Sequence, residues 1–163
     1  MNPKWPAKSI KLFGPGTASG TFDYFCEEVL KKKAGSRADY QQSEDDNVLV
    51  QGVAGDKYAL GYFGYAYYQE SQDEVNALAI VTDKAPDGVL PTAKTIGETY
   101  PLSRPLFIYI NKKSLKTPAV KAFAQFYLAT ENQNQIVEAG FINLHPQEFT
   151  ESRARLAAEM NAK

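Results

Sequence analysis

Cysteine and histidine are nearly absent, with one of each, Cys26 and His145, among 163 residues. A single cysteine excludes an intramolecular disulfide. A lone histidine with no cysteine near it in sequence supports neither a zinc site nor a Cys/His or Ser/His/Asp hydrolase. Cys26 lies on the apolar side of a predicted helix, so we interpret it as a small buried hydrophobe rather than a nucleophile. We therefore expect no metal, no cofactor and no enzymatic reaction.

An excess of charge of one sign and long apolar runs are also missing. The chain has 18 Lys and Arg against 19 Asp and Glu, a formal net charge of −1, which gives no overall attraction to nucleic acid or to an anionic membrane. No apolar run approaches the length of a membrane span, and residues 1–15 lack the apolar stretch of a signal peptide. The composition suits one globular domain or two small units, in which any selectivity for an anion must be local.

Small residues gather between a predicted strand at 10–13 and a predicted helix over 20–33, in the order Gly-Pro-Gly-Thr-Ala-Ser-Gly-Thr. The glycines let a ligand approach the backbone, while Ser19 and Thr21 place hydroxyl groups where the helix begins. The first turn of a helix offers unpaired amides and the positive end of its dipole, which together favour an oxyanion. The same residues also suit an ordinary helix with a serine N-cap.

The remaining pattern alternates strands and helices and predicts an α/β fold. Ser43 suits the N-cap of a helix through Val53, and Thr117-Pro118 suits the start of another, with Phe123 and Tyr127 on its buried face. Phe107–Ile110 reads as a buried strand. The other expected elements are strands at 59–63 and 76–81, a surface loop at 82–92, and helices near 93–98, 117–129, 131–138 and 147–161.

Aromatic residues are dense between Tyr58 and Tyr68. Such a cluster is compatible with base stacking in a nucleic-acid site. No Lys or Arg is interleaved after Lys57, however, and the neighbours are glycine and alanine. A core strand with a following helix accounts for the pattern better, so we expect no nucleic-acid partner.

The loop at 14–25, Gly-Pro-Gly-Thr-Ala-Ser-Gly-Thr-Phe-Asp-Tyr-Phe, is similar to the phosphate-binding loop of periplasmic phosphate-binding proteins, the substrate receptors of ABC phosphate importers. The resemblance continues in the family's order over nearly the whole chain. Its further blocks lie at 36–40, 43–53, 59–68 and 101–110.

The resemblance implies a type II periplasmic-binding-protein-like fold, a periplasmic location and binding of inorganic phosphate without chemistry. It assigns phosphate contacts to Ser19, Gly20, Thr21 and Arg37. Members of the family have two lobes and about twice this length, so the chain resembles the second half only, and Met1 looks like a cut end. Residues 1–103 would form part of the phosphate-binding lobe, and residues 104–163 the crossover strand and C-terminal helices of the other lobe.

Two departures from the family bear on this assignment. Ala18 stands where we expect Asp in close relatives, and the carboxylate that accepts the phosphate proton would belong to the missing half. The partners implied are phosphate, the missing N-terminal half, a self-association partner or the transporter permease. The alternative function is a half-receptor interaction module that has lost tight phosphate binding. A phosphoryl-transfer enzyme is weakly supported, because no base, nucleophile pair or metal-binding carboxylate cluster stands out.

Arg37 is the residue whose role the sequence leaves most open. A guanidinium binds two phosphate oxygens at once, and a nearby carboxylate orients it. The same position also suits a surface salt bridge with Asp39 or Glu44. Arg104, in the crossover segment, is expected to be structural.

Overall fold

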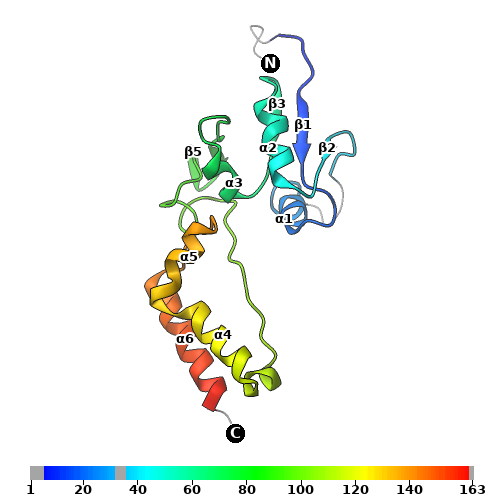
Figure 1. Cartoon of the computed structure of the whole chain (residues 1–163). Helices are drawn as coiled ribbons and strands as arrows, with labels where there is room; N and C mark the ends of the chain where they lie inside the picture. Colours follow the sequence, from blue (N-terminus) through cyan, green and yellow to red (C-terminus); the bar gives the residue numbers. More distant parts are fainter. Residues whose placement is uncertain (1–5, 32–35, 162–163) are drawn as a thin grey trace. The chain divides into compact units, whose positions relative to one another are not determined.

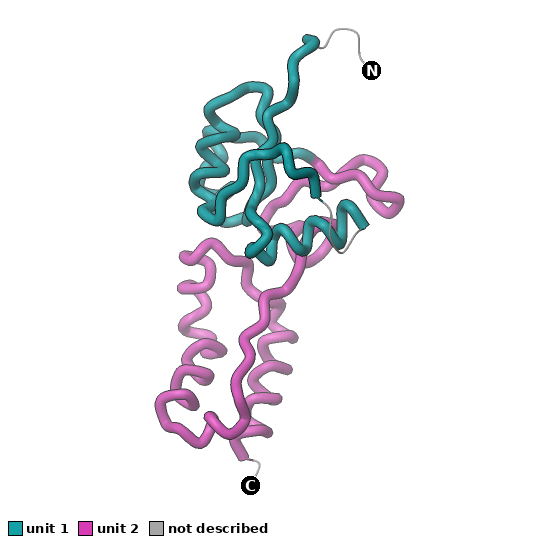
Figure 2. Tube along the Cα trace, turned by 90° about the vertical axis from the view of Figure 1, so that its right-hand side faces the viewer, with its two compact units in different colours: residues 1–78 teal, residues 79–163 magenta. Residues whose placement is uncertain are grey.

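Strands and helices alternate through the first half of the chain. The structure, a computed structural model, describes residues 6–31 and 36–161 (Figure 1). Contacts divide the chain into two units, residues 1–78 and 79–163 (Figure 2). This division reflects internal contacts and does not test the assignment of residues 1–103 and 104–163 to two lobes, which stays a prediction.

The first unit contains a parallel sheet of three short strands, in the order β2-β1-β3. In the register, Phe13 of β1 pairs with Gln41 of β2, and Leu12 pairs with Leu60 of β3. Each strand leads into the helix of the same number. The elements are β1 (Lys11–Gly14), α1 (Gly20–Glu28), β2 (Gln41–Gln42), α2 (Asp46–Ala54), β3 (Ala59–Gly61) and α3 (Tyr65–Glu70).

The core of this unit lies where α1 and α2 meet the sheet. Cys26 is 1% exposed, which confirms the interpretation of this residue as a buried small hydrophobe. The buried apolar residues of the unit are Phe13, Cys26, Leu49, Val50 and Val75. A Cβ atom added at Gly52 of α2 would overlap the Phe13 ring, with Cζ of the ring 2.9 Å away. Glycine at 52 therefore lets α2 approach β1 closely.

We expect Gly52→Ala to lower the free energy of unfolding by about 1–3 kcal/mol, the usual effect of overpacking a core. The sign of this change in the free energy of unfolding is informative, because alanine at an open helix position stabilises a protein by about 1 kcal/mol relative to glycine. Val48→Ala is the control, since Val48 lies on the same helix and is 55% exposed. Urea denaturation of both variants checks this. A stabilised Gly52→Ala protein would contradict the close approach.

The second unit consists of an antiparallel hairpin and a group of helices. The hairpin pairs β4 (Ile80–Thr82) with β5 (Ala85–Val89). In the helical part, α4 packs against α6 and the 3₁₀ helix η1, around the buried residues Leu115, Ala124 and Phe149. The helices are η1 (Lys112–Lys116), α4 (Pro118–Leu128), η2 (Thr130–Asn132), α5 (Gln133–Glu138) and α6 (Pro146–Asn161).

The predicted α/β organisation is confirmed, and several boundaries lie close to those expected. Helix α4 begins at Pro118 with Thr117 as its N-cap residue, and α5 is followed by Gly140, which has a φ of 81°. Helix α6 covers the predicted span at 147–161, with Phe149 buried. In the aromatic run, the strand expected at 59–63 is formed only by Ala59–Gly61 (β3), and the helix expected after it is α3.

Two helix ends in the first unit differ from the prediction. Helix α1 stops at Glu28 rather than continuing to 33, and Lys31 has a φ of 52°, so the chain has left the helix there. Residues 32 and 33 lie outside the described part of the chain. Helix α2 is capped by Asp45 instead of Ser43, whose hydroxyl accepts from the Asp45 amide at 3.0 Å.

The segment 76–98 differs more. The strand expected at 76–81 is formed only by Ile80–Thr82, and the loop expected at 82–92 contains β5. The helix expected near 93–98 is a series of turns. Gly97 has a φ of 83°, which is incompatible with a right-handed helix at that residue. Short hydrophobic runs mislead here, since strand formation depends on the partner across the turn as well as on the residues themselves.

The prediction of a buried strand at Phe107–Ile110 is wrong, since the described residues form no strand there. The segment is extended without a strand partner (Figure 1), and Phe107 and Tyr109 are 69% and 90% exposed. On α4, Phe123 and Tyr127 are also exposed, at 56% and 38%, rather than buried. All of these residues have the composition of a core, but the described residues leave a large part of each side chain uncovered.

Candidate anion-binding site

The candidate site lies at one edge of the parallel sheet. Because β1, β2 and β3 are parallel, their carboxyl ends share one edge, and α1, α2 and α3 all begin there. Loop 15–19, which joins β1 to α1, occupies this edge. Such edges are where open α/β sheets bind ligands.

The four consecutive carbonyl groups of residues 13–16, at the end of β1 and the start of the loop, accept hydrogen bonds from the protein. The carbonyl oxygens of Phe13 and Gly14 accept from the amides of Tyr62 and Ser43, both at 3.3 Å, and that of Gly16 accepts from the Ser19 amide at 3.1 Å. The carbonyl of Pro15 accepts from the Tyr40 hydroxyl at 2.9 Å. Residues 13–16 are buried, whereas Thr17 and Ala18 are exposed. The base of the loop is therefore fixed, and its tip faces solvent.

Ser19 is the N-cap of α1. Its side-chain oxygen accepts from the Thr21 amide at 3.1 Å, so this amide already has a partner. Gly20 is exposed, and among the described residues no protein group accepts from its amide. The donors left for an anion thus include the Gly20 amide, the hydroxyl hydrogen of Ser19 and the hydroxyl of Thr21. The serine N-cap is therefore confirmed, and it leaves donors at the start of α1 that an anion could use.

Arg37 forms a bidentate ion pair with Asp39. Its Nε lies 2.7 Å from Oδ1 and its Nη2 lies 2.5 Å from Oδ2. Both side chains are about two-thirds exposed. This hydrogen bonding lowers the pKa of Asp39 and raises that of Arg37. Within the described residues, no hydrogen bond or ion pair joins Arg37 to Ser19, Gly20 or Thr21, so the structure brings the three loop residues together without the arginine.

The acidic residues at the start of α2 accept hydrogen bonds from backbone amides. Asp45 accepts from the Asn47 amide at 2.9 Å and caps the helix. Asp46 accepts from the Gly64 amide at 3.1 Å, which fixes the turn between β3 and α3. Glu44 lies directly against Gly16, where an added Cβ would overlap its carboxylate. A carboxylate therefore adjoins the anion loop, a contact that the spacing of these residues did not reveal.

Two tyrosines complete the support of the loop, and sequence reasoning missed both. The Tyr62 ring stacks on Phe25 of α1 with centroids 4.0 Å apart, and an added Cβ at Gly14 would come within 2.6 Å of it. Burial raises the pKa of the Tyr62 phenol and that of the Tyr40 phenol. The aromatic density at 58–68 was visible in the sequence, but not that one of its rings packs on the first glycine of the loop.

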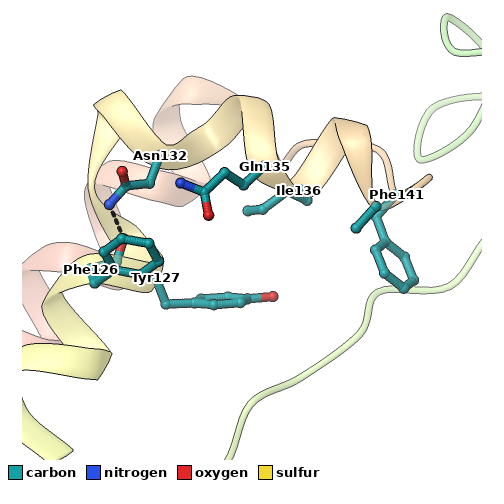
Figure 3. Close-up of a pocket in the computed structure, with 7 residues that line it drawn as sticks. Phe126, Tyr127, Asn132, Gln135, Ile136 and Phe141 are labelled. Atoms are coloured by element: carbon teal, nitrogen blue, oxygen red, sulfur yellow. Dashed lines mark hydrogen bonds between the residues drawn. The ribbon is translucent and has the colours of Figure 1, made fainter. Parts of the chain in front are cut away.

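The second unit has an apolar hollow of about 180 Å³ beside α4 and α5 (Figure 3). The hollow is lined by Phe126, Tyr127, Asn132, Gln135, Ile136, Ala139 and Phe141. Two of these residues are joined by a hydrogen bond, in which the Asn132 side-chain amide donates to the Phe126 carbonyl at 2.9 Å. No charged side chain is among these residues, so the hollow suits an apolar group rather than an anion.

Comparison with known proteins places this geometry in a family. Residues 3–131 match the model of the PBP superfamily domain. Protein SphX of Synechocystis sp. is 44% identical over 151 residues, which are 91% of this chain and 44% of that protein. Phosphate-binding protein PstS of Staphylococcus saprophyticus is 37% identical over 158 residues, 96% of this chain and 48% of that protein.

A solved structure agrees with these relatives. A crystal structure of a possible phosphate binding protein from Planctomyces limnophilus superposes with a TM-score of 0.77 at 45% identity, covering 98% of this chain and 57% of that one. The chain thus spans about half the length of the proteins it matches. In the described ranges, no helix has the length and apolar character needed to cross a membrane. By its matched domain and its α/β fold, the chain belongs to the PBP superfamily.

Proposed function

We propose that the chain binds inorganic phosphate at the loop between β1 and α1, as part of the substrate-binding component of an ABC phosphate importer in the periplasm. The observation that carries the proposal is the loop itself, whose carbonyls at 13–16 are all bonded to the protein while the Gly20 amide at the start of α1 is exposed. The relatives named as phosphate-binding proteins support the choice of anion.

The start of α1 favours a small oxyanion, whereas the Glu44 carboxylate beside Gly16 opposes one. The amides at a helix N-terminus and the helix dipole attract negative charge, and the Ser19 and Thr21 hydroxyls add donors of the right reach. Arg37 is the remaining proposed ligand. Its present partner, Asp39, accepts from Nε and Nη2 of the planar guanidinium and leaves its other N–H groups to donate, which is how a carboxylate orients an arginine toward an anion.

Titration calorimetry with inorganic phosphate, with sulfate in parallel, tests the proposal. Addition of phosphate is expected to give a saturable heat of binding. It is also expected to shift the NMR signal of the Gly20 amide more than that of an exposed amide in the second unit, such as Gly97. Incubation with a generic phosphate ester is expected to give no turnover. The absence of both heat and a Gly20 shift at millimolar phosphate would contradict the proposal.

A second candidate function rests on the exposed apolar residues of the second unit. We infer that the segment 106–110 and the hollow beside α4 and α5 pair with another polypeptide, either the part of the receptor that this chain lacks or a second copy of the chain. The exposure of Leu106, Phe107 and Tyr109 supports this inference, as does the 57% coverage of the solved relative. Residues 104–163 would then complete a second lobe, and the permease would meet only the assembled receptor.

A further inference from the structure

The carbonyl of Pro15 differs from its neighbours in the kind of donor that holds it. The carbonyls of Phe13, Gly14 and Gly16 accept from backbone amides, which remain whatever the side chains are. Pro15 alone accepts from a side chain, the hydroxyl of Tyr40, which is 25 residues away in sequence and 2.9 Å away in space. One side chain therefore controls one peptide of the anion loop.

Burial makes this single hydrogen bond consequential. Pro15 is among the largest side chains with less than 2% exposure, so its carbonyl has no access to bulk water. A buried carbonyl that loses its donor is costly, and the peptide gains by rotating toward another partner. Gly16 follows directly and opposes such a rotation least, because glycine has no side chain. The Gly16 carbonyl in turn holds the Ser19 amide, so a rotation would displace the N-cap of α1.

The donor is itself held by the sheet. Tyr40 directly precedes β2, whose residues Gln41 and Gln42 pair with Phe13 and Gly14 of β1. Its ring also contacts the Gly14 position, where an added Cβ would lie 3.3 Å from ring carbon Cε2. A donor next to a paired strand beside the loop has little freedom of its own and can therefore fix the loop.

We propose that Tyr40 is a positioning residue for phosphate, which acts through the Pro15 carbonyl to hold the Ser19–Gly20 turn in its binding geometry without contacting the anion. The inference rests on the proposed phosphate binding. It assigns to the Tyr40 hydroxyl a role in phosphate affinity that is separate from the packing of the Tyr40 ring. The two roles can be tested separately, because the hydroxyl can be changed while the ring is kept.

The test compares three forms of the full chain by phosphate calorimetry. Tyr40→Phe keeps the ring and removes the donor, and its Kd is expected to rise about tenfold, the effect of losing one buried hydrogen bond. Replacement of Tyr40 by 4-aminophenylalanine restores an N–H donor and is expected to recover most of the affinity. Tyr58→Phe is the matched control, because the hydroxyl of this half-buried tyrosine of the same unit makes no hydrogen bond within the described residues, and its Kd is expected to stay unchanged.

The amide signals of Ser19 and Gly20 without phosphate provide a second readout, and they are expected to move in Tyr40→Phe and return with 4-aminophenylalanine. If the wild type binds phosphate and Tyr40→Phe binds equally well, the positioning role is overturned and the proposed function stands. If affinity falls in Tyr40→Phe but the added donor does not recover it, the hydroxyl acts in some way other than by donating to the Pro15 carbonyl, which also overturns the proposal. A wild type that binds no phosphate overturns the proposed function and this inference with it.

Discussion

Arg37→Ala is expected to raise the Kd for phosphate by a factor of about 10–150, measured by calorimetry on the folded variant. A charge-assisted hydrogen bond contributes roughly 1.5–3 kcal/mol, and every 1.4 kcal/mol is a factor of ten. Stability is expected to change little, because the Arg37–Asp39 pair is about two-thirds exposed and exposed pairs stabilise weakly. The combination of lost affinity and retained stability is the signature of a ligand rather than a structural ion pair.

Two variants separate these roles. Arg37→Lys is expected to recover only part of the affinity, because an ammonium group cannot reproduce the planar guanidinium. Arg104→Ala is the matched control; it lies in the second unit before the exposed segment, and its loss is expected to leave the affinity for phosphate unchanged. If Arg37→Ala binds phosphate as tightly as the wild type, Arg37 is only the surface partner of Asp39. Ser19, Gly20 and Thr21 would then hold the anion alone.

The sequence predicted the elements that carry their own signals. Helix α4 has a cap residue and a proline at its start, and the glycine-rich loop lies between β1 and α1 as expected. The donors at Ser19 and Gly20 follow from local spacing, since both belong to one turn. These features depend on neighbours within a few residues, which a sequence shows directly.

The missed features depend on contacts between distant residues. The Tyr40 hydroxyl meets Pro15 across 25 positions, and Asp46 meets Gly64 across 18. No periodicity encodes such pairs. The wrong strand at Phe107–Ile110 has a different cause, because its composition is that of a buried strand and only the neighbouring strand is missing from the described residues.

This exposed segment leads to the second prediction, that the chain alone associates with itself at high concentration. Leu106, Phe107 and Tyr109 are between 61% and 90% exposed. Within the described residues, the backbone of 106–110 makes no backbone hydrogen bond, so its groups are available to another strand. At about 25 cal/mol per Å² of apolar surface, burial of a few hundred Å² contributes several kcal/mol to association. Sedimentation velocity over a range of concentrations and binding of a hydrophobic dye measure the effect.

A matched pair of substitutions locates the surface. Phe107→Asp is expected to reduce both self-association and dye binding, because it places a charge in the segment. Val81→Asp is the control, since Val81 is similarly exposed, at 64% against 69% for Phe107, but lies in the β4–β5 hairpin. Addition of a polypeptide equivalent to the part of the solved relative that this chain does not cover is expected to suppress dye binding to the wild type and not to Phe107→Asp. A chain that stays monomeric at high concentration and binds no dye would show that these side chains are covered in solution, and the segment would then not be a docking surface.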